Sequence, residues 1–123
     1  WTFTDKDKAS STLKTAAKHG GMGFRQILLI LGGEKRPAVM TRSNVYRALC
    51  ELDDTLCIIE SKASIPLPEF IDELVNLGVN NAIYLDMGGW NHSWYRKYEH
   101  YKASYIHKSE HNYYTNWLTF YIK

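Results

Sequence analysis

The segment NNAIYLDMGGWNHSWY carries the residues best suited to chemistry, because an apolar run ends there on an acid. The acid is Asp86, and Gly88 and Gly89 follow it closely. Glycines let the main chain approach a ligand and direct N–H groups at an anion, so a carboxylate at this place can act on a bound molecule. Alternatively, Asp86 accepts hydrogen bonds within a tight turn. The spacing alone leaves both interpretations open.

The loop after the glycines extends this candidate site with polar and aromatic side chains. They are Trp90, Asn91, His92, Trp94 and Tyr95. The imidazole of His92 can donate a proton or contact a phosphate, although a lone loop histidine is often only solvated. The rings can form a wall against a sugar, or close the core beneath a long loop. Twelve of the seventeen aromatic residues lie between Tyr84 and Tyr121, so a stacking surface is one interpretation of this half of the chain.

A predicted strand–helix–strand unit positions Asp86. The helix lies in IPLPEFIDELVNLGV, with Pro68 at its first turn and Gly78 as its stop, and NAIYLD follows as a buried strand. Such a β-α-β unit is expected to be right-handed and parallel. In open α/β sheets, ligands bind at the carboxyl ends of strands, which is where Asp86 falls.

A hairpin precedes the helix. In VYRALCELDDTLCIIE, two strand-like runs flank Asp53-Asp54, which predicts a two-residue turn. Residue numbers that face each other then sum to 107, so Cys50 faces Cys57. This is a hydrogen-bonded pair, whose wider Cα separation suits a disulfide less well, and two free, buried thiols are the favoured interpretation. A bridge would instead indicate a non-reducing compartment.

Weaker patterns complete an α+β prediction. Ser10 or Ser11 is expected to cap a short N-terminal helix that ends at Gly20 or Gly21. Further strands are predicted over residues 24–31 and 116–122, the second after a long aromatic loop. The predicted fold is a mixed β-sheet with a β-hairpin and one β-α-β unit, with helices packed on the sheet.

Chain length, net charge and the length of the apolar runs exclude some classes of function. The chain has 123 residues and a formal net charge of +2, which is too small for a nucleic-acid footprint. The basic and aromatic stretch of residues 95–102 is therefore interpreted as a solvated rim. No apolar run is long enough to span a bilayer. The sequence HKSEH at residues 107–111 matches a zinc-protease pattern, but its neighbours lack the helical period that this motif needs, so no metal and no cofactor are predicted.

Several segments together resemble the phosphodiester glycosidase family. GVNNAIYLDMGGWNHSWY is similar to that family's "G-alkyl-LDGGGS" segment, and YRALCELDDTLCIIESK resembles its arginine and hairpin segment. The helix LPEFIDELVNLGV lies between them in the expected order, and NWLTFY matches the family's last strand. The resemblance runs from about residue 24 to the C-terminus. It implies one domain over residues 1–123 that lacks the family's N-terminal portion.

The resemblance also implies roles for individual residues. Asp86 falls on the family's strand-end acid and would be the carboxylate near the anomeric carbon. Gly88 and Gly89 fall on the glycine turn, and Arg47 on an arginine whose fork suits a phosphodiester, unless it only forms a surface ion pair. Glu60 is the candidate second carboxylate, or else a solvated strand end. The sequence departs from the family at Met87, which replaces a glycine, and at Trp90 and Asn91, where serine is usual.

The implied activity is hydrolysis of a sugar 1-phosphodiester or a related glycosidic bond. The alternative is a non-catalytic module that holds a glycan with the same residues. Either way, a carbohydrate or sugar-phosphate ligand is expected, without nucleic acid or a membrane span. The resemblance implies an extracytoplasmic location. The oligomeric state is left open by the sequence.

Overall fold

A computed structural model describes residues 1–85, 93–96, 102–107 and 118–119. The chain divides into two compact units, residues 1–86 and 87–123. The described elements are α1 (Lys6–Lys18), β1 (Leu28–Leu31), β2 (Glu34–Lys35), β3 (Ser43–Asn44), β4 (Arg47–Leu52), β5 (Thr55–Glu60), β6 (Ile65–Pro66), α2 (Leu67–Asn76), β7 (Asn81–Leu85), β8 (Ser93–Tyr95) and β9 (Ser104–His107).

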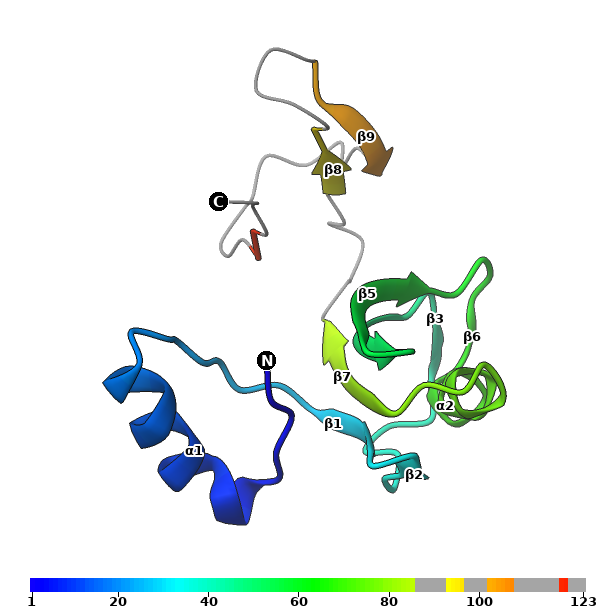
Figure 1. The fold of residues 1–123 in the computed structure, drawn as a ribbon. Coiled ribbons are helices and arrows are strands. Elements are labelled where there is room, and N and C mark those ends of the chain that lie inside the picture. The colour runs from blue at the N-terminus through cyan, green and yellow to red at the C-terminus, as the bar shows by residue number, and fades with distance from the viewer. Residues whose placement is uncertain (86–92, 97–101, 108–117, 120–123) are drawn as a thin grey trace. The chain divides into compact units, whose positions relative to one another are not determined.

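A five-stranded sheet forms the framework of the first unit, in the order β2-β1-β7-β4-β5 (Figure 1). Strand β4 pairs antiparallel with both β5 and β7, so β5 and β7 run in the same direction with β4 between them. The strands of the predicted β-α-β unit are therefore parallel, but a third strand separates them. The predicted α+β class is confirmed. The expected mixed sheet is wrong in one respect, since all four ladders of this sheet are antiparallel.

The β4–β5 hairpin has the predicted register, with Leu52 opposite Thr55 and Cys50 opposite Cys57. Asp53 and Asp54 form its turn with φ angles of 48° and 56°. A two-residue turn of type I′ needs positive φ at both central residues, because its twist then matches that of the strands. Aspartate tolerates this conformation better than most residues, which explains why the acidic pair can close the hairpin.

Helix α2 covers one face of the sheet and forms the core with it. Its buried residues recur at the helical spacing of one face: Leu67, Phe70, Ile71 and Leu74. They pack against strand residues and against Tyr46, which directly precedes β4. The Tyr46 ring stacks on Phe70 and meets Tyr84 of β7 edge-on, both with centroids 5.9 Å apart. Val75 and Leu77, by contrast, are 37% and 57% exposed, since they lie off this stripe.

The end of α2 is fixed by its backbone. Gly78 has φ +83°, and its N–H donates to the Val75 carbonyl at 2.9 Å. The N–H of Val79 donates to the Leu74 carbonyl at 3.1 Å. These two bonds make a Schellman motif, in which glycine takes the left-handed position. The predicted stop at Gly78 is confirmed, and it directs the chain into β7.

The N-terminal part differs from its prediction at two boundaries. Helix α1 begins after Asp5, whose carboxylate accepts hydrogen bonds from the N–H groups of Asp7 and Lys8, both at 3.2 Å. The N-cap is thus five residues before the predicted Ser10. Helix α1 buries none of its residues, so of the two described helices only α2 packs on the sheet as predicted. Strand β1 starts at Leu28, four residues after the predicted Phe24, and residues 24–26 are exposed.

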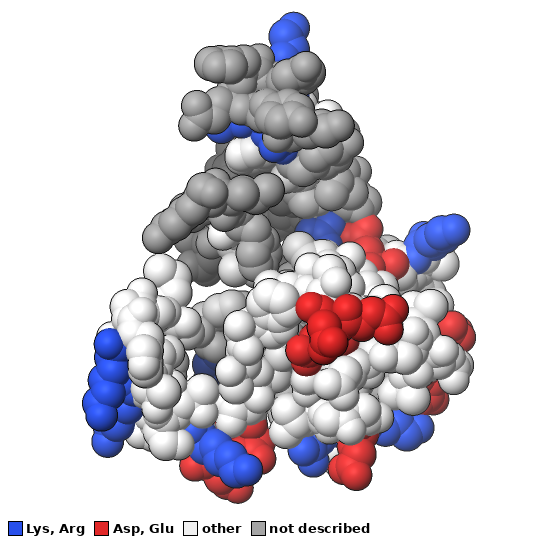
Figure 2. Space-filling view, viewed as in Figure 1, with Lys and Arg blue, Asp and Glu red and all other residues white. Residues whose placement is uncertain are grey.

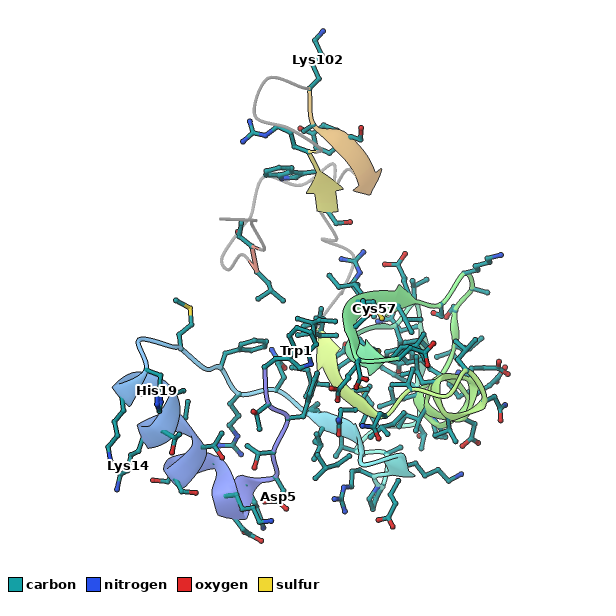
Figure 3. All side chains as sticks on the ribbon, viewed as in Figure 1. Trp1, Asp5, Lys14, His19, Cys57 and Lys102 are labelled. Carbon is teal, nitrogen blue, oxygen red and sulfur yellow. The ribbon has the colours of Figure 1, made fainter. Side chains whose placement is uncertain are left out.

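Trp1 lies beside the sheet (Figure 3), where its indole N–H donates to Glu51 Oε1 at 3.2 Å. On the face shown in Figure 2, a group of acidic side chains lies near the centre of the described surface, and basic side chains lie mainly towards its margins. Neither described helix is long and apolar enough to cross a membrane.

The second unit contains a short antiparallel ladder between β8 and β9. The predicted aromatic loop therefore includes two strands. They are only three and four residues long, which is too short for an alternating pattern to be recognised in the sequence. Of the predicted last strand, Leu118 and Thr119 are described and lie outside any strand. The other residues of that prediction lie outside the described ranges.

Candidate functional site

The first residue of β4 lies between the last residues of its two neighbours, β5 and β7. Arg47, the first residue of β4, is opposite Glu60 on one side and Leu85 on the other. Glu60 is the last residue of β5, and Leu85 is the last residue of β7. Two of the predicted site residues, Arg47 and Glu60, are thus brought together beside the strand that precedes Asp86. Asp86 itself lies outside the described residues.

Arg47 and Glu60 form an ion pair. Arg47 Nε donates to Glu60 Oε2 at 2.9 Å, and Arg47 Nη2 donates to the same oxygen. The side chains retain 10% and 21% of their exposure, and Arg47 as a residue is 8% exposed. Charge-assisted bonds of this kind hold a guanidinium in a fixed plane. The ion pair that one interpretation of Arg47 expected is present, but it is largely buried rather than at the surface, and it lies at the strand ends where a ligand role was predicted.

The sequence contained a signal for this pair. The facing numbers 47 and 60 sum to 107, as do those of the two cysteines, so the hairpin register places an arginine opposite a glutamate. An opposite-charge cross-strand pair is a recognised stabilising contact. The two residues were considered separately in the sequence interpretation, as a phosphate contact and as a second carboxylate.

A hollow of about 280 Å³ lies next to Glu60. One wall is the end of β5 and the loop after it, from Ile59 to Ala63, and the other is α2 with Phe70, Leu74 and Leu77. Its lining is mainly apolar, with charged groups at Glu60, Lys62 and Glu73. The hydroxyl of Ser61 is already engaged, since it accepts from Tyr46 N–H and donates to the Ala63 carbonyl, both at 2.9 Å.

The glycine and aromatic loop of the predicted site lies outside the described residues. This applies to Met87, Gly88, Gly89, Trp90, Asn91 and His92. Trp94 is described and lies on β8, opposite Tyr105 of β9. These two residues are 42% and 53% exposed. Directly opposite residues share one face of a ladder, so the unit presents two neighbouring aromatic residues on that face.

The hairpin cysteines are free thiols, and Cys50 is buried while Cys57 on β5 is half-buried (Figure 3). The prediction of two unbridged thiols is confirmed, with Cys57 less buried than expected. Burial, and then the neighbouring Cys57, raises the pKa of Cys50 to about 12, and burial also raises the pKa of Cys57. Both thiols are therefore poor nucleophiles, because the thiolate is the reactive form.

Burial of Cys50 predicts a loss of stability in alkali. The unfolded chain releases the thiol proton above about pH 8.5, whereas the folded chain keeps it until about pH 12. The stability that the protonated, buried thiol contributes is therefore fully present below about pH 8.5. It is lost as the pH rises towards 12, by up to about 1.4 kcal/mol per pH unit. Urea unfolding of wild type and Cys50→Ala between pH 8.5 and 11 measures this loss of stability. Tyrosines and lysines titrate in both proteins, so the difference between the two pH dependences isolates the contribution of Cys50. Parallel curves for the two proteins would contradict it.

The described residues contain no group of three or more His, Cys, Asp or Glu side chains placed to hold a metal ion. Of the HKSEH pattern, residues 108–111 lie outside the described ranges. Comparison with protein-family models, curated proteins and solved structures found no match for this chain.

Proposed function

We propose that this chain hydrolyses a sugar 1-phosphodiester at the end of the sheet where β4, β5 and β7 meet. The observation that supports the proposal is the register that sets Arg47 between Glu60 and Leu85, the residue before Asp86. An arginine and a carboxylate at adjoining strand ends are the groups that this reaction needs. The family resemblance of the surrounding segments adds to this support and carries with it an extracytoplasmic location.

The reaction would break the bond between the anomeric carbon and the bridging oxygen. Water supplies the hydroxyl of the released sugar and the proton that the phosphate monoester finally carries. The leaving oxygen takes the bonding electron pair and is weakly basic, so strong acid catalysis is not needed. Asp86 would act at the anomeric carbon as nucleophile, base or cation stabiliser.

Arg47 would supply charge for the phosphate oxygens, and Glu60 would hold its guanidinium in plane. This assignment differs from the sequence interpretation, in which Glu60 was the second catalytic carboxylate. The reason is geometric, since Glu60 Oε2 accepts two hydrogen bonds from Arg47. A carboxylate held in this way is better suited to orienting the cation than to attacking a substrate.

Replacing Asp86 by asparagine is the decisive test. Incubation of wild type with aryl and nucleotide-sugar phosphodiesters should release free sugar, and Asp86→Asn should lower kcat at least about a hundredfold. Ligand affinity should change little, because asparagine keeps the shape of the side chain. Asp72→Asn is the matched control, since Asp72 forms an exposed ion pair with Lys35 and should leave turnover unchanged. Full activity of Asp86→Asn would refute the proposal.

A glycan-binding module is the second candidate, and the Trp94–Tyr105 pair favours it. Two half-exposed aromatic residues on one face of a ladder offer a platform for the apolar face of a sugar. In this case no wild-type turnover would appear with any phosphodiester. Calorimetric titration with oligosaccharides would detect binding that Trp94→Ala abolishes and Asp86→Asn does not.

A further inference from the structure

The two cysteines of this chain face each other across the β4–β5 hairpin. The sequence contains no other cysteine, and the register sets Cys50 of β4 directly opposite Cys57 of β5. Directly opposite side chains project to the same face of a ladder. Cys50 belongs to the core cluster that includes α2 and Cys57 packs against it, so the shared face is the one that α2 covers. Any disulfide within one copy of the chain must therefore join these two residues.

The spacing of the two strands allows such a bridge. Residues that close a two-residue turn form a hydrogen-bonded pair, and such pairs alternate along the ladder, so Cys50 and Cys57 form one as well. Just after β5, the N–H of Ser61 donates to the Tyr46 carbonyl at 2.9 Å, which continues the alternation. The Cα atoms of such a pair lie about 5.5 Å apart, and bridged cysteines span about 4.4 to 6.8 Å. The sulfurs can therefore bond by side-chain rotation, without a shift of either strand.

Solvent reaches the two thiols unequally. Cys50 is 0% exposed, whereas Cys57 lies half-buried on the edge strand of the sheet. The pKa of Cys50 is raised to about 12 by burial and then by the neighbouring Cys57, and the second cause requires the two thiols to lie close together. The half-buried thiol is therefore placed to meet an oxidant first, and the enclosed thiol to react second.

We propose that Cys50 and Cys57 are a reversible oxidation site, at which a low-molecular-weight disulfide such as glutathione disulfide closes a bridge across the hairpin. The Cys57 thiolate attacks one sulfur of the oxidant and releases one thiolate. Cys50, after losing its proton to solvent, attacks Cys57 Sγ in the mixed disulfide and releases the second thiolate. The cysteines lose two electrons and two protons, the oxidant gains the electrons, and the released thiolates take up the protons. This site is independent of the proposed hydrolysis.

The bridge is expected to be reducible rather than permanent. A hydrogen-bonded cross-strand pair is the less favourable setting for a disulfide, and strained disulfides have the more oxidising potentials that are typical of labile bridges. The bridged form is therefore expected in an oxidising compartment, and the free thiols in a reducing one. Oxidation ties together the two strands that also carry the Arg47–Glu60 ion pair.

Equilibration of the full chain in mixtures of reduced and oxidised glutathione tests the proposal. Buried thiols exchange slowly, so samples that start reduced and samples that start oxidised should be held until they agree. Mass spectrometry after acid quenching detects the bridge as the loss of two hydrogens from the 14.3 kDa chain. The ratio of bridged to reduced chain should be at least about tenfold higher under native conditions than in guanidinium chloride, because the fold holds the cysteines together. An equal or lower native ratio would overturn the proposal.

Two single variants separate the roles of the thiols. In Cys50→Ala, the mixed disulfide of Cys57 with glutathione should persist, because no second thiol removes it, and its yield should exceed that of wild type at least about tenfold. In Cys57→Ser, the remaining thiol is enclosed and should form little adduct. Equal yields of mixed disulfide in wild type and Cys50→Ala would overturn the proposal. Adduct formation in Cys57→Ser that equals that in Cys50→Ala would contradict the order of attack.

A matched control moves one thiol along the same face of β5. Cys57→Ser combined with Thr55→Cys keeps two cysteines in the hairpin, and Thr55 is exposed, so the core is little disturbed. Thr55 is diagonal to Cys50, and diagonal neighbours lie about 7–8 Å apart, which is beyond the reach of a bridge. Native conditions should therefore give no increase in the bridged fraction over guanidinium chloride. An increase as large as that of wild type would show that the register does not determine the bridge, and would overturn the proposal.

Discussion

Replacing Arg47 by methionine is expected to lower the free energy of unfolding of the first unit by about 3 kcal/mol. The change keeps much of the side-chain volume but removes the guanidinium that donates two hydrogen bonds to Glu60 Oε2. Glu60 retains 21% of its side-chain exposure, so the carboxylate can recover part of its hydration, and the loss falls at the lower end of the range for buried pairs. Native-state hydrogen exchange of β4 amides measures the stability of this unit directly.

The matched variant is the double replacement Arg47→Met with Glu60→Leu. It removes both charges and fills the site with apolar atoms, so it should recover most of the lost stability. The double-mutant cycle with Glu60→Leu isolates the coupling between the two side chains, expected at about 1–3 kcal/mol. Additive effects would show that the pair is not coupled, and would remove the reason for assigning Glu60 to the orientation of Arg47.

Replacing Leu74 by alanine is expected to cost about 3 kcal/mol of stability. Leu74 is fully buried on the face of α2 that packs on the sheet, beside Phe70 and Ile71. The loss combines the transfer free energy of the removed methyl groups with the cavity they leave. Urea unfolding followed by far-UV circular dichroism should show an earlier transition for this variant.

Leu77→Ala, at the C-cap residue of the same helix, provides the control. The chemical change is identical, but Leu77 is 57% exposed, so stability should change by no more than about 0.5 kcal/mol. A similar loss for both variants would mean that α2 does not pack through the Leu67, Phe70, Ile71 and Leu74 stripe.

Local features were predictable because short-range physics determines them. The Asp53-Asp54 turn, the facing of Cys50 and Cys57, and the stop at Gly78 each depend on a few consecutive residues, and each is found in the structure. The missed boundary of α1 was local as well. Asp is as good an N-cap residue as Ser, so residue type alone does not distinguish Asp5 from the predicted Ser10.

Strand order was not predictable in the same way. The pairing of β7 with β1 and β4 joins residues far apart in sequence, and no hydrophobic period records which neighbour a buried strand will choose. The connection through α2 correctly predicted that β5 and β7 run parallel. It does not show that β4 lies between them, so we expected β5 and β7 to pair directly in a mixed sheet.

The candidate site was predictable only as far as the hairpin register. That register brings Arg47 opposite Glu60, and both were named from the sequence. The proximity of the end of β7 depended on the strand order. Asp86, Gly88, Gly89, Trp90, Asn91 and His92 remain predictions, because they lie outside the described residues.

The position of β7 has a consequence for synthesis on the ribosome. This strand is the last of the five to leave the exit tunnel, yet it is the central one, bonded to β1 on one side and β4 on the other. Until residues 81–85 emerge, the nascent polypeptide holds two separate hairpins whose inner edges have no neighbour from the same sheet. The sheet can therefore be completed only when β7 inserts between β1 and β4. Just before that strand emerges, the unpaired strand edges of the nascent chain are most exposed to chaperones and to incorrect pairing.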